Sequence, residues 1–196
     1  MNSNRRFPIV PRRLAFAAFL VFTSLAQAHP GHGPQDLIGG FLHPLTGWDH
    51  LLAMVSIGAW AALMGGRSRW VMPASFLALM AVGAFEGRNL GPIPGLDQAI
   101  AASVVVLGLL LVFAVRLPAF DGAVIAGLFA LFHGYAHGSE MSGSSLLPYS
   151  AGFAAATALL LGAGVLLGTL ARRSPALVPR AAGAAVAIAG AWLIFG

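Results

Sequence analysis

The scarcity of charged side chains constrains this chain more than any other feature of its sequence. Only 9% of its 196 residues are Asp, Glu, Lys or Arg, and 58% are hydrophobic. A soluble domain carries about 25% charged residues, which cover its water-facing surface. With a mean hydropathy of +0.84, this chain cannot cover a surface of its size with polar groups. The sequence therefore predicts an integral membrane protein.

The positive charge is concentrated at the N-terminus. All 11 basic residues are arginines, and four of them (Arg5, Arg6, Arg12 and Arg13) precede residue 14, which leaves a net charge of +1 beyond that point. A basic face suited to nucleic acid is therefore not expected, and we predict no nucleic-acid partner. Cysteine is absent, which excludes disulfides, thiolate metal sites and cysteine nucleophiles.

Residues 1–28 have the pattern of a cleaved secretory signal peptide. The four arginines are followed by a short apolar stretch from Leu14 to Leu25, and Ala26-Gln27-Ala28 supplies a cleavage pattern of small residues. The alternative is an uncleaved first transmembrane helix. Cleavage would leave a mature chain that begins at His29, outside the inner membrane of a bacterium.

The remaining residues, 29–196, are predicted to form one all-α domain, a bundle of six transmembrane helices. Crossing about 30 Å of hydrocarbon takes about 20 helical residues. Small residues recur at four-residue spacings in the last two segments and predict close helix packing there; they are Gly152, Ala156, Gly164 and Gly168, and then Ala181, Ala185 and Ala189. Apolar segments separated by Gly, Pro and Arg are expected near 41–64, 70–86, 97–115, 120–138, 146–171 and 178–195.

The arginines predict the orientation of this bundle. With the mature N-terminus outside, the external connections contain only Arg88. Cytoplasmic loops of membrane proteins carry an excess of Lys and Arg. Both termini are therefore expected on the periplasmic side of a multi-pass inner-membrane protein, with six arginines in its cytoplasmic connections: Arg67, Arg69, Arg116, Arg172, Arg173 and Arg180.

Histidines and acids cluster at three places in the sequence. Ionisable groups are costly in lipid, so such clusters are candidates for functional sites. The first segment contains His43, Asp49 and His50, and the fourth contains His133, His137 and Glu140. The predicted mature N-terminus adds His29 and His32.

Helical periodicity predicts how each cluster is arranged. In one continuous helix, His43 and His50 would share a face about 10 Å apart along the axis, with Pro44 in the first turn. Asp49 would either join a metal ion or orient a neighbouring imidazole. His133 and His137 have the i,i+4 spacing of two imidazoles on one face. Glu140 is expected to close the second cluster on its outer side.

A single imidazole in a membrane is ordinarily a hydrogen-bonding group between helices, and a histidine-bearing terminus can be a solvated stub. Two clusters at matching depth favour a shared metal site instead. Imidazole and carboxylate ligands suit Ni²⁺, Co²⁺, Zn²⁺ or Fe²⁺ and disfavour a Cu(I) carrier. If one ion is shared, the His50 and His137 side chains should lie within roughly 8 Å of each other.

At these residues the sequence resembles the HupE/UreJ family of bacterial nickel permeases. His43, Asp49 and His50 match its H-x5-D-H pattern, and Phe132 to Glu140 match its F-H-G-x-A-H-G-x-E pattern. The resemblance implies uptake of Ni²⁺, or Co²⁺ in some members, to supply proteins that mature hydrogenase or urease. The metal would be the transported ion, and no permanently bound cofactor is expected. The sequence does not decide whether the chain forms a homo-oligomer.

The chain has no GxxxxGK[ST] motif, so transport is expected to be passive or driven by the membrane potential. His29 and His32 would gather the ion, and the two intramembrane clusters would pass it inward. The main alternative is an intramembrane zinc hydrolase in which His50, His133 and His137 bind the metal. The chain contains neither of the hydrolase motifs HExxH and GxSxG. A metal sensor or a chaperone subunit is a third interpretation.

Overall fold

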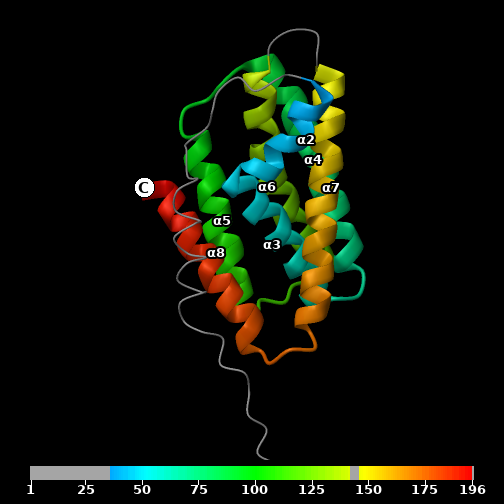
Figure 1. Ribbon diagram of the computed structural model, residues 1–196, viewed down its shortest axis with the longest axis vertical. Coiled ribbons are helices and arrows are strands. Elements are labelled where there is room, and N and C mark those ends of the chain that lie inside the picture. Colours follow the sequence, from blue (N-terminus) through cyan, green and yellow to red (C-terminus); the bar gives the residue numbers. More distant parts are fainter. Residues whose placement is uncertain (1–35, 142–145, 196) are drawn as a thin grey trace, which may run out of the picture. The chain divides into compact units, whose positions relative to one another are not determined.

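All the regular structure in the described part of the chain, residues 36–141 and 146–195, is α-helical in this computed structural model. Residues 32–196 form one compact unit. The predicted signal peptide and both His29 and His32 lie outside the described residues. The helices shown in Figure 1 are α2 (Leu37–Thr46), α3 (Trp48–Met64), α4 (Ser68–Leu90), α5 (Leu96–Val112), α6 (Ala119–Glu140), α7 (Leu146–Ala171) and α8 (Leu177–Phe195).

Five of the six predicted segments correspond to single helices, α4 to α8. The predicted fifth segment, 146–171, has the same bounds as α7. Among the described residues, four helices are long and apolar enough to cross a membrane: α4, α6, α7 and α8. The helices α3 and α5 have 17 residues each, and α2 has 10. An all-helical membrane protein is therefore supported, and the count of six spanning helices stays a prediction.

The first predicted segment, 41–64, is wrong as a single helix. It is two helices, α2 and α3, which are separated at Gly47 by extended backbone with φ −80° and ψ 114°. Pro44 also lies near the end of α2, whereas the sequence predicted it in a first turn. Proline lacks the N–H that a helix interior uses, and Asp49 in the first turn of α3 favours a new helix start.

The helices α4 and α6 are joined along their length by glycines. A Cβ atom at Gly83 or Gly87 of α4 would collide with the backbone of Leu131 or Tyr135 in α6. In the reverse direction, Cβ atoms at Gly134 and Gly138 of α6 would collide with the backbone of α4. Backbones approach this closely only where both helices present small residues. These two helices therefore form one tightly packed unit.

The small-residue pattern of α7 packs in the same way against α2 and α3. Gly152 lies against the backbone of Leu37 in α2, and Gly164 and Gly168 lie against Val55 and Ala59 in α3. The prediction of close packing along this stripe is confirmed. The helix break at Gly47 therefore lies within a second packed unit, made of α2, α3 and α7.

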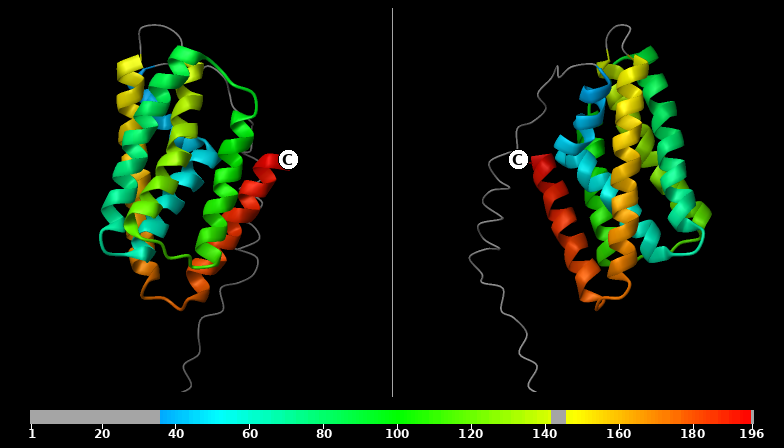
Figure 2. Two further views of the ribbon diagram at one scale, coloured as in Figure 1. Left: turned by 180° about the vertical axis from the view of Figure 1, so that it is seen from behind. Right: turned by 45° about the vertical axis from the view of Figure 1, so that its right-hand side comes forward.

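The predicted packing stripe of α8 is corrected by the structure. Ala181 and Ala185 are exposed, whereas Gly183 and Gly190 are buried against α5. Cβ atoms at either glycine would meet the backbone of α5 at Gly108 or Val105. Glycine allows the closer approach, so the face of α8 that contains Gly183 and Gly190 packs. Both views in Figure 2 show α5 and α8 side by side.

The unit of α2, α3 and α7 meets the unit of α4 and α6 through side chains. Met54, Phe76 and Met80 are buried between them. The Thr157 hydroxyl of α7 lies 3.8 Å from the Met80 sulfur of α4. No described glycine of one unit has the backbone of the other unit against it. We call this boundary the seam. Figure 1 shows α3, which lies at the seam, enclosed among the other helices.

The glycine contacts generate a test on one helix. Gly164→Ala should place a methyl group against the Val55 carbonyl, whereas Gly162→Ala should enter open space two residues away. Overpacking costs about 1–3 kcal/mol, which lowers an unfolding midpoint by roughly 2–10 °C in a chain of this size. We expect that loss for Gly164→Ala in detergent-purified protein. Equal midpoints for the two variants would contradict the packing of α7 against α3.

Candidate metal centre

Three histidines from three different helices converge beside the seam. They are His43 near the end of α2, His50 in the first turn of α3 and His137 in the last turn of α6. Each offers one ring nitrogen, and these three atoms all lie within 4.8 Å of one another. His50 and His137 are buried, with 1% and 5% exposure, and His43 is half-buried. We call these residues the histidine trio.

The trio corrects the geometry expected of the first cluster and confirms the expected proximity of the two clusters. The His43 and His50 ring centroids are 5.5 Å apart, because the break at Gly47 turns α2 relative to α3. A continuous helix would have separated these residues by about 10 Å. The His50 and His137 ring centroids are 4.5 Å apart, which is within the predicted limit.

Asp49 fixes the orientation of the His50 ring. Its Oδ1 atom lies 2.6 Å from His50 Nδ1 and also accepts the His50 backbone N–H at 2.8 Å. A carboxylate is an acceptor only, so Nδ1 carries the proton in this pair. The other ring nitrogen, Nε2, contacts His137 Nε2. Of the two roles predicted for Asp49, the geometry shows the orienting one.

His133 lies next to the trio but is not part of it. Its ring centroid is 5.1 Å from that of His50 and 5.9 Å from that of Phe76. The Nδ1–H group donates to the Phe129 carbonyl one turn earlier, at 2.7 Å. The Nε2 atom is fully buried and has no hydrogen-bond partner among the described residues. His133 therefore presents an unused nitrogen lone pair beside His50.

Glu140 is not brought into this group. It is the last residue of α6 and its side chain is exposed. The donor atoms that lie together belong to the trio. Glu140 is therefore not one of the clustered donor atoms, because α6 continues past His137 and carries Glu140 to its exposed end.

An aromatic wall from α7 was missed by the sequence analysis. The Phe153 ring lies 4.4 Å from His137, 6.0 Å from His43 and 6.1 Å from His50, measured between centroids. Tyr149 lies one turn before Phe153 and 6.3 Å from His43. The available signal was an aromatic pair at i,i+4 in a helix otherwise made of small and aliphatic residues. These rings cover one side of the trio.

A cavity of about 390 Å³ reaches the trio from between α4, α6 and α7. Phe153, Tyr149 and His137 line it on the side of the histidines, and Met80, Ala84 and Gly134 line it along the other two helices. The walls are mostly apolar. The cavity extends along the seam, so the two packed units do not fill the space between them at this level.

The trio directs imidazole nitrogens from three helices toward one point. Such nitrogens are the ligands that borderline divalent metals prefer, and three of them leave positions open for water or a further ligand. Two facing Nε2 lone pairs repel each other unless a cation or a proton lies between them. The arrangement of His50 and His137 therefore suits a shared cation.

The comparisons with known proteins agree on one family. The family profile described as "HupE / UreJ protein" matches residues 17–193. A curated relative, "Protein HupE" of Rhizobium leguminosarum bv. viciae, is 41% identical over 181 residues, which cover 91% of this chain and 95% of the relative. No solved structure matches the chain.

Both matches span almost the whole chain, including the helices that carry His43, His50, His133 and His137. The resemblance noted from the two histidine motifs is thereby confirmed. This chain belongs to the HupE/UreJ family.

Proposed function

We propose that this chain is a permease that carries a divalent transition-metal ion across the bacterial inner membrane into the cytoplasm. The observation that carries the proposal is the histidine trio, in which nitrogens from three helices lie within 4.8 Å of one another. Buried ionisable groups in a membrane protein ordinarily mark an ion pathway or proton relay. The cargo implied by the family resemblance is Ni²⁺, with Co²⁺ as a second ion.

The chemistry of the trio supports this cargo. Imidazole binds Ni²⁺ and Co²⁺ well, whereas a Cu(I) carrier would use several thioethers or thiolates. A conducting site must bind the ion strongly enough to replace its water and weakly enough to release it. Three protein ligands with open positions satisfy both requirements. Asp49 supports binding indirectly, because its contact with Nδ1 holds the His50 ring in one orientation with Nε2 directed at His137.

The position of the trio at the seam supports a mechanism of relative movement. His43 and His50 belong to the unit of α2, α3 and α7, whereas His137 belongs to the unit of α4 and α6. Each unit is held by backbone contacts at glycine, and the seam is made of side chains and a cavity. A small displacement of one unit against the other would separate the ligands and release the ion. Carriers commonly bind their cargo between such units.

His133 is the proposed next ligand on the inward path. It lies one turn before His137 on α6, and its unpartnered Nε2 is beside His50. An ion that leaves the trio would find an available imidazole there. The membrane potential supplies about 2.3 kcal/mol per charge per 100 mV, which favours the entry of a divalent cation. The cytoplasmic recipients would be proteins that mature hydrogenase or urease.

The hydrolase alternative gains no support from the geometry. A metal hydrolase needs a carboxylate placed to move protons at the metal-bound water. Glu140 is exposed at the end of α6, and Asp49 is engaged with His50. We therefore do not retain this alternative.

The first functional test removes single ligands. His50→Ala and His137→Ala should each reduce uptake of radioactive nickel into proteoliposomes to the level of protein-free vesicles, because two imidazoles compensate poorly for the lost water. His133→Ala should slow uptake and leave nickel affinity nearly unchanged. The control is Leu128→Ala, which alters an exposed residue of the same helix outside the histidine motif. Normal uptake by His50→Ala or His137→Ala, at equal protein level, would exclude the pathway.

The second test concerns His29 and His32, which we propose as capture ligands outside the membrane. Replacing both with alanine should lower initial uptake rates at nickel concentrations below the half-saturation value and leave the saturated rate unchanged. Local capture raises the concentration of the ion near the entrance and does not alter the limiting step. An equal loss at saturating nickel would instead place these residues in the transport path.

A further inference from the structure

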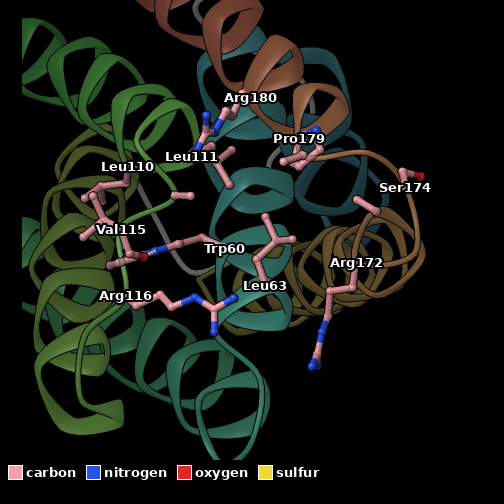
Figure 3. A pocket seen from close by; sticks show the side chains of 13 residues that line it. Trp60, Leu63, Leu110, Leu111, Val115, Arg116, Arg172, Ser174, Pro179 and Arg180 are labelled. Atoms are coloured by element: carbon pink, nitrogen blue, oxygen red, sulfur yellow. Dashed lines mark hydrogen bonds between the residues drawn. The ribbon is translucent and has the colours of Figure 1, made fainter.

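A second cavity, of about 360 Å³, opens at the end of the bundle where α3, α5 and α7 finish and α8 begins. Three arginines line it: Arg116 from the connection after α5, Arg172 from the end of α7 and Arg180 from the start of α8. Trp60, Leu63 and Leu111 form its apolar floor. Figure 3 shows Arg116 and Arg180 on opposite sides of Trp60 and Leu63, with Arg172 beyond Leu63. We call this the arginine pocket.

No carboxylate among the described residues pairs with the arginines of this pocket. The ion pair between Asp49 and His50 belongs to the metal centre. No described carboxylate therefore lies within 4.0 Å of the three guanidinium groups. Asp121 lies in the first turn of α6, at this end of the bundle, but it does not line the cavity. Three like charges around one cavity repel one another, and a bound anion would remove that repulsion.

The backbone around the arginine pocket is held in place by specific contacts. The buried Trp60 indole N–H donates to the Val115 carbonyl at 2.9 Å and so ties the segment before Arg116 to α3. Ala114 lines the cavity with φ 50°, a left-handed conformation that is uncommon outside glycine. Two hydrogen bonds at the end of α5 stabilise this conformation: Ala114 N–H donates to the Leu111 carbonyl, and Val115 N–H donates to the Leu110 carbonyl.

Arg172 is accommodated by a glycine. A Cβ atom at Gly65 would lie 3.0 Å from Arg172 Nη1, so the absence of a side chain there leaves room for the guanidinium group. Gly65 has φ 78° and ends α3. The turn that ends α3 thus also shapes the wall of the pocket. An excess of arginine at one end of a helix bundle sets the orientation of the protein in the membrane. That role does not require the arginines to line one cavity.

We propose that the arginine pocket binds a phosphate group, carried by an anionic phospholipid or free in solution. Guanidinium groups pair with phosphate through two parallel hydrogen bonds, and arginine is the residue best suited to that geometry. Exposed apolar side chains adjoin the lining residues in the sequence: Phe113 precedes Ala114, and Leu177 and Val178 lie between Ala176 and Pro179. In a membrane these would contact acyl chains. The combination favours the lipid as the source, because basic pockets between membrane helices bind anionic headgroups.

The test uses the purified full-length chain in a mild non-ionic detergent. Native mass spectrometry would measure binding of phosphatidylglycerol, phosphatidylcholine and inorganic phosphate in separate titrations. The pocket variant is Arg116→Gln, Arg172→Gln and Arg180→Gln combined. The matched control is Arg67→Gln, Arg69→Gln and Arg173→Gln combined, which removes the same charge from residues that do not line the pocket.

The pocket variant should bind phosphatidylglycerol at least about tenfold more weakly than the unaltered chain, and the control should stay within about twofold. Phosphatidylcholine should bind weakly to all three proteins. Tight binding of inorganic phosphate with the same dependence on the pocket arginines would identify the free anion as the source. Equal losses in the two triple variants, or no phosphate-dependent binding at all, would overturn the proposal.

Single substitutions provide the measurement if the triple variant fails to fold. Arg116→Gln and Arg180→Gln should each weaken phosphatidylglycerol binding more than Arg173→Gln does. Nickel affinity should be unchanged in every one of these variants, since the arginine pocket lies at the far end of α3 from His50. The outcome is thus independent of the proposed transport function.

Discussion

The extended backbone at Gly47 determines the geometry of the histidine centre. It divides one apolar segment into α2 and α3, so that His43 turns back toward His50 and their rings lie 5.5 Å apart. A break inside a membrane is costly unless its backbone groups find partners. Here the Gly47 N–H donates to the His43 carbonyl at 3.0 Å, and the Gly47 carbonyl accepts the Leu51 N–H at 2.9 Å. Both backbone groups of Gly47 are therefore satisfied within the segment itself.

The second determinant is the unequal strength of helix contacts around that centre. Glycines bring α4 against α6 and α7 against α2 and α3 at backbone distance, whereas the seam between these units is made of side chains and a cavity. The trio takes two ligands from one side of the seam and one from the other. Packing thus places the candidate ligands on both sides of the seam, so that a rigid-body shift of one unit would change their separation. A site contained within one unit could not respond in this way.

The sequence predicted most of the helices but missed the break at Gly47, which brings His43 to His50. Glycine, proline and arginine mark the helix ends well, and the i,i+4 spacing placed His133 and His137 on one helix. Periodicity could not predict the break at Gly47, because apolar residues continue on both sides of it. Thr46-Gly47 followed by Asp49 was the local signal. Its meaning depends on tertiary contacts, such as those of Gly40 and Gly152 that hold α2 against α7.

The identity of packing partners was equally out of reach. A stripe of small residues predicts that some helix approaches closely but does not say which one. The pairing of α4 with α6, and the choice of Gly183 and Gly190 for the buried face of α8, emerge only from the assembled bundle. The aromatic wall of Tyr149 and Phe153 likewise acquires its meaning from the position of α7 beside the trio.

The central claim is that His43, His50 and His137 bind one ion together. X-ray absorption at the nickel edge of the nickel-loaded full chain tests it most directly, because imidazole ligands give a countable multiple-scattering signal. The account predicts three imidazoles in the unaltered chain, two in His43→Ala and three in His133→Ala. Three imidazoles in His43→Ala, or a loss of one in His133→Ala, would contradict the account.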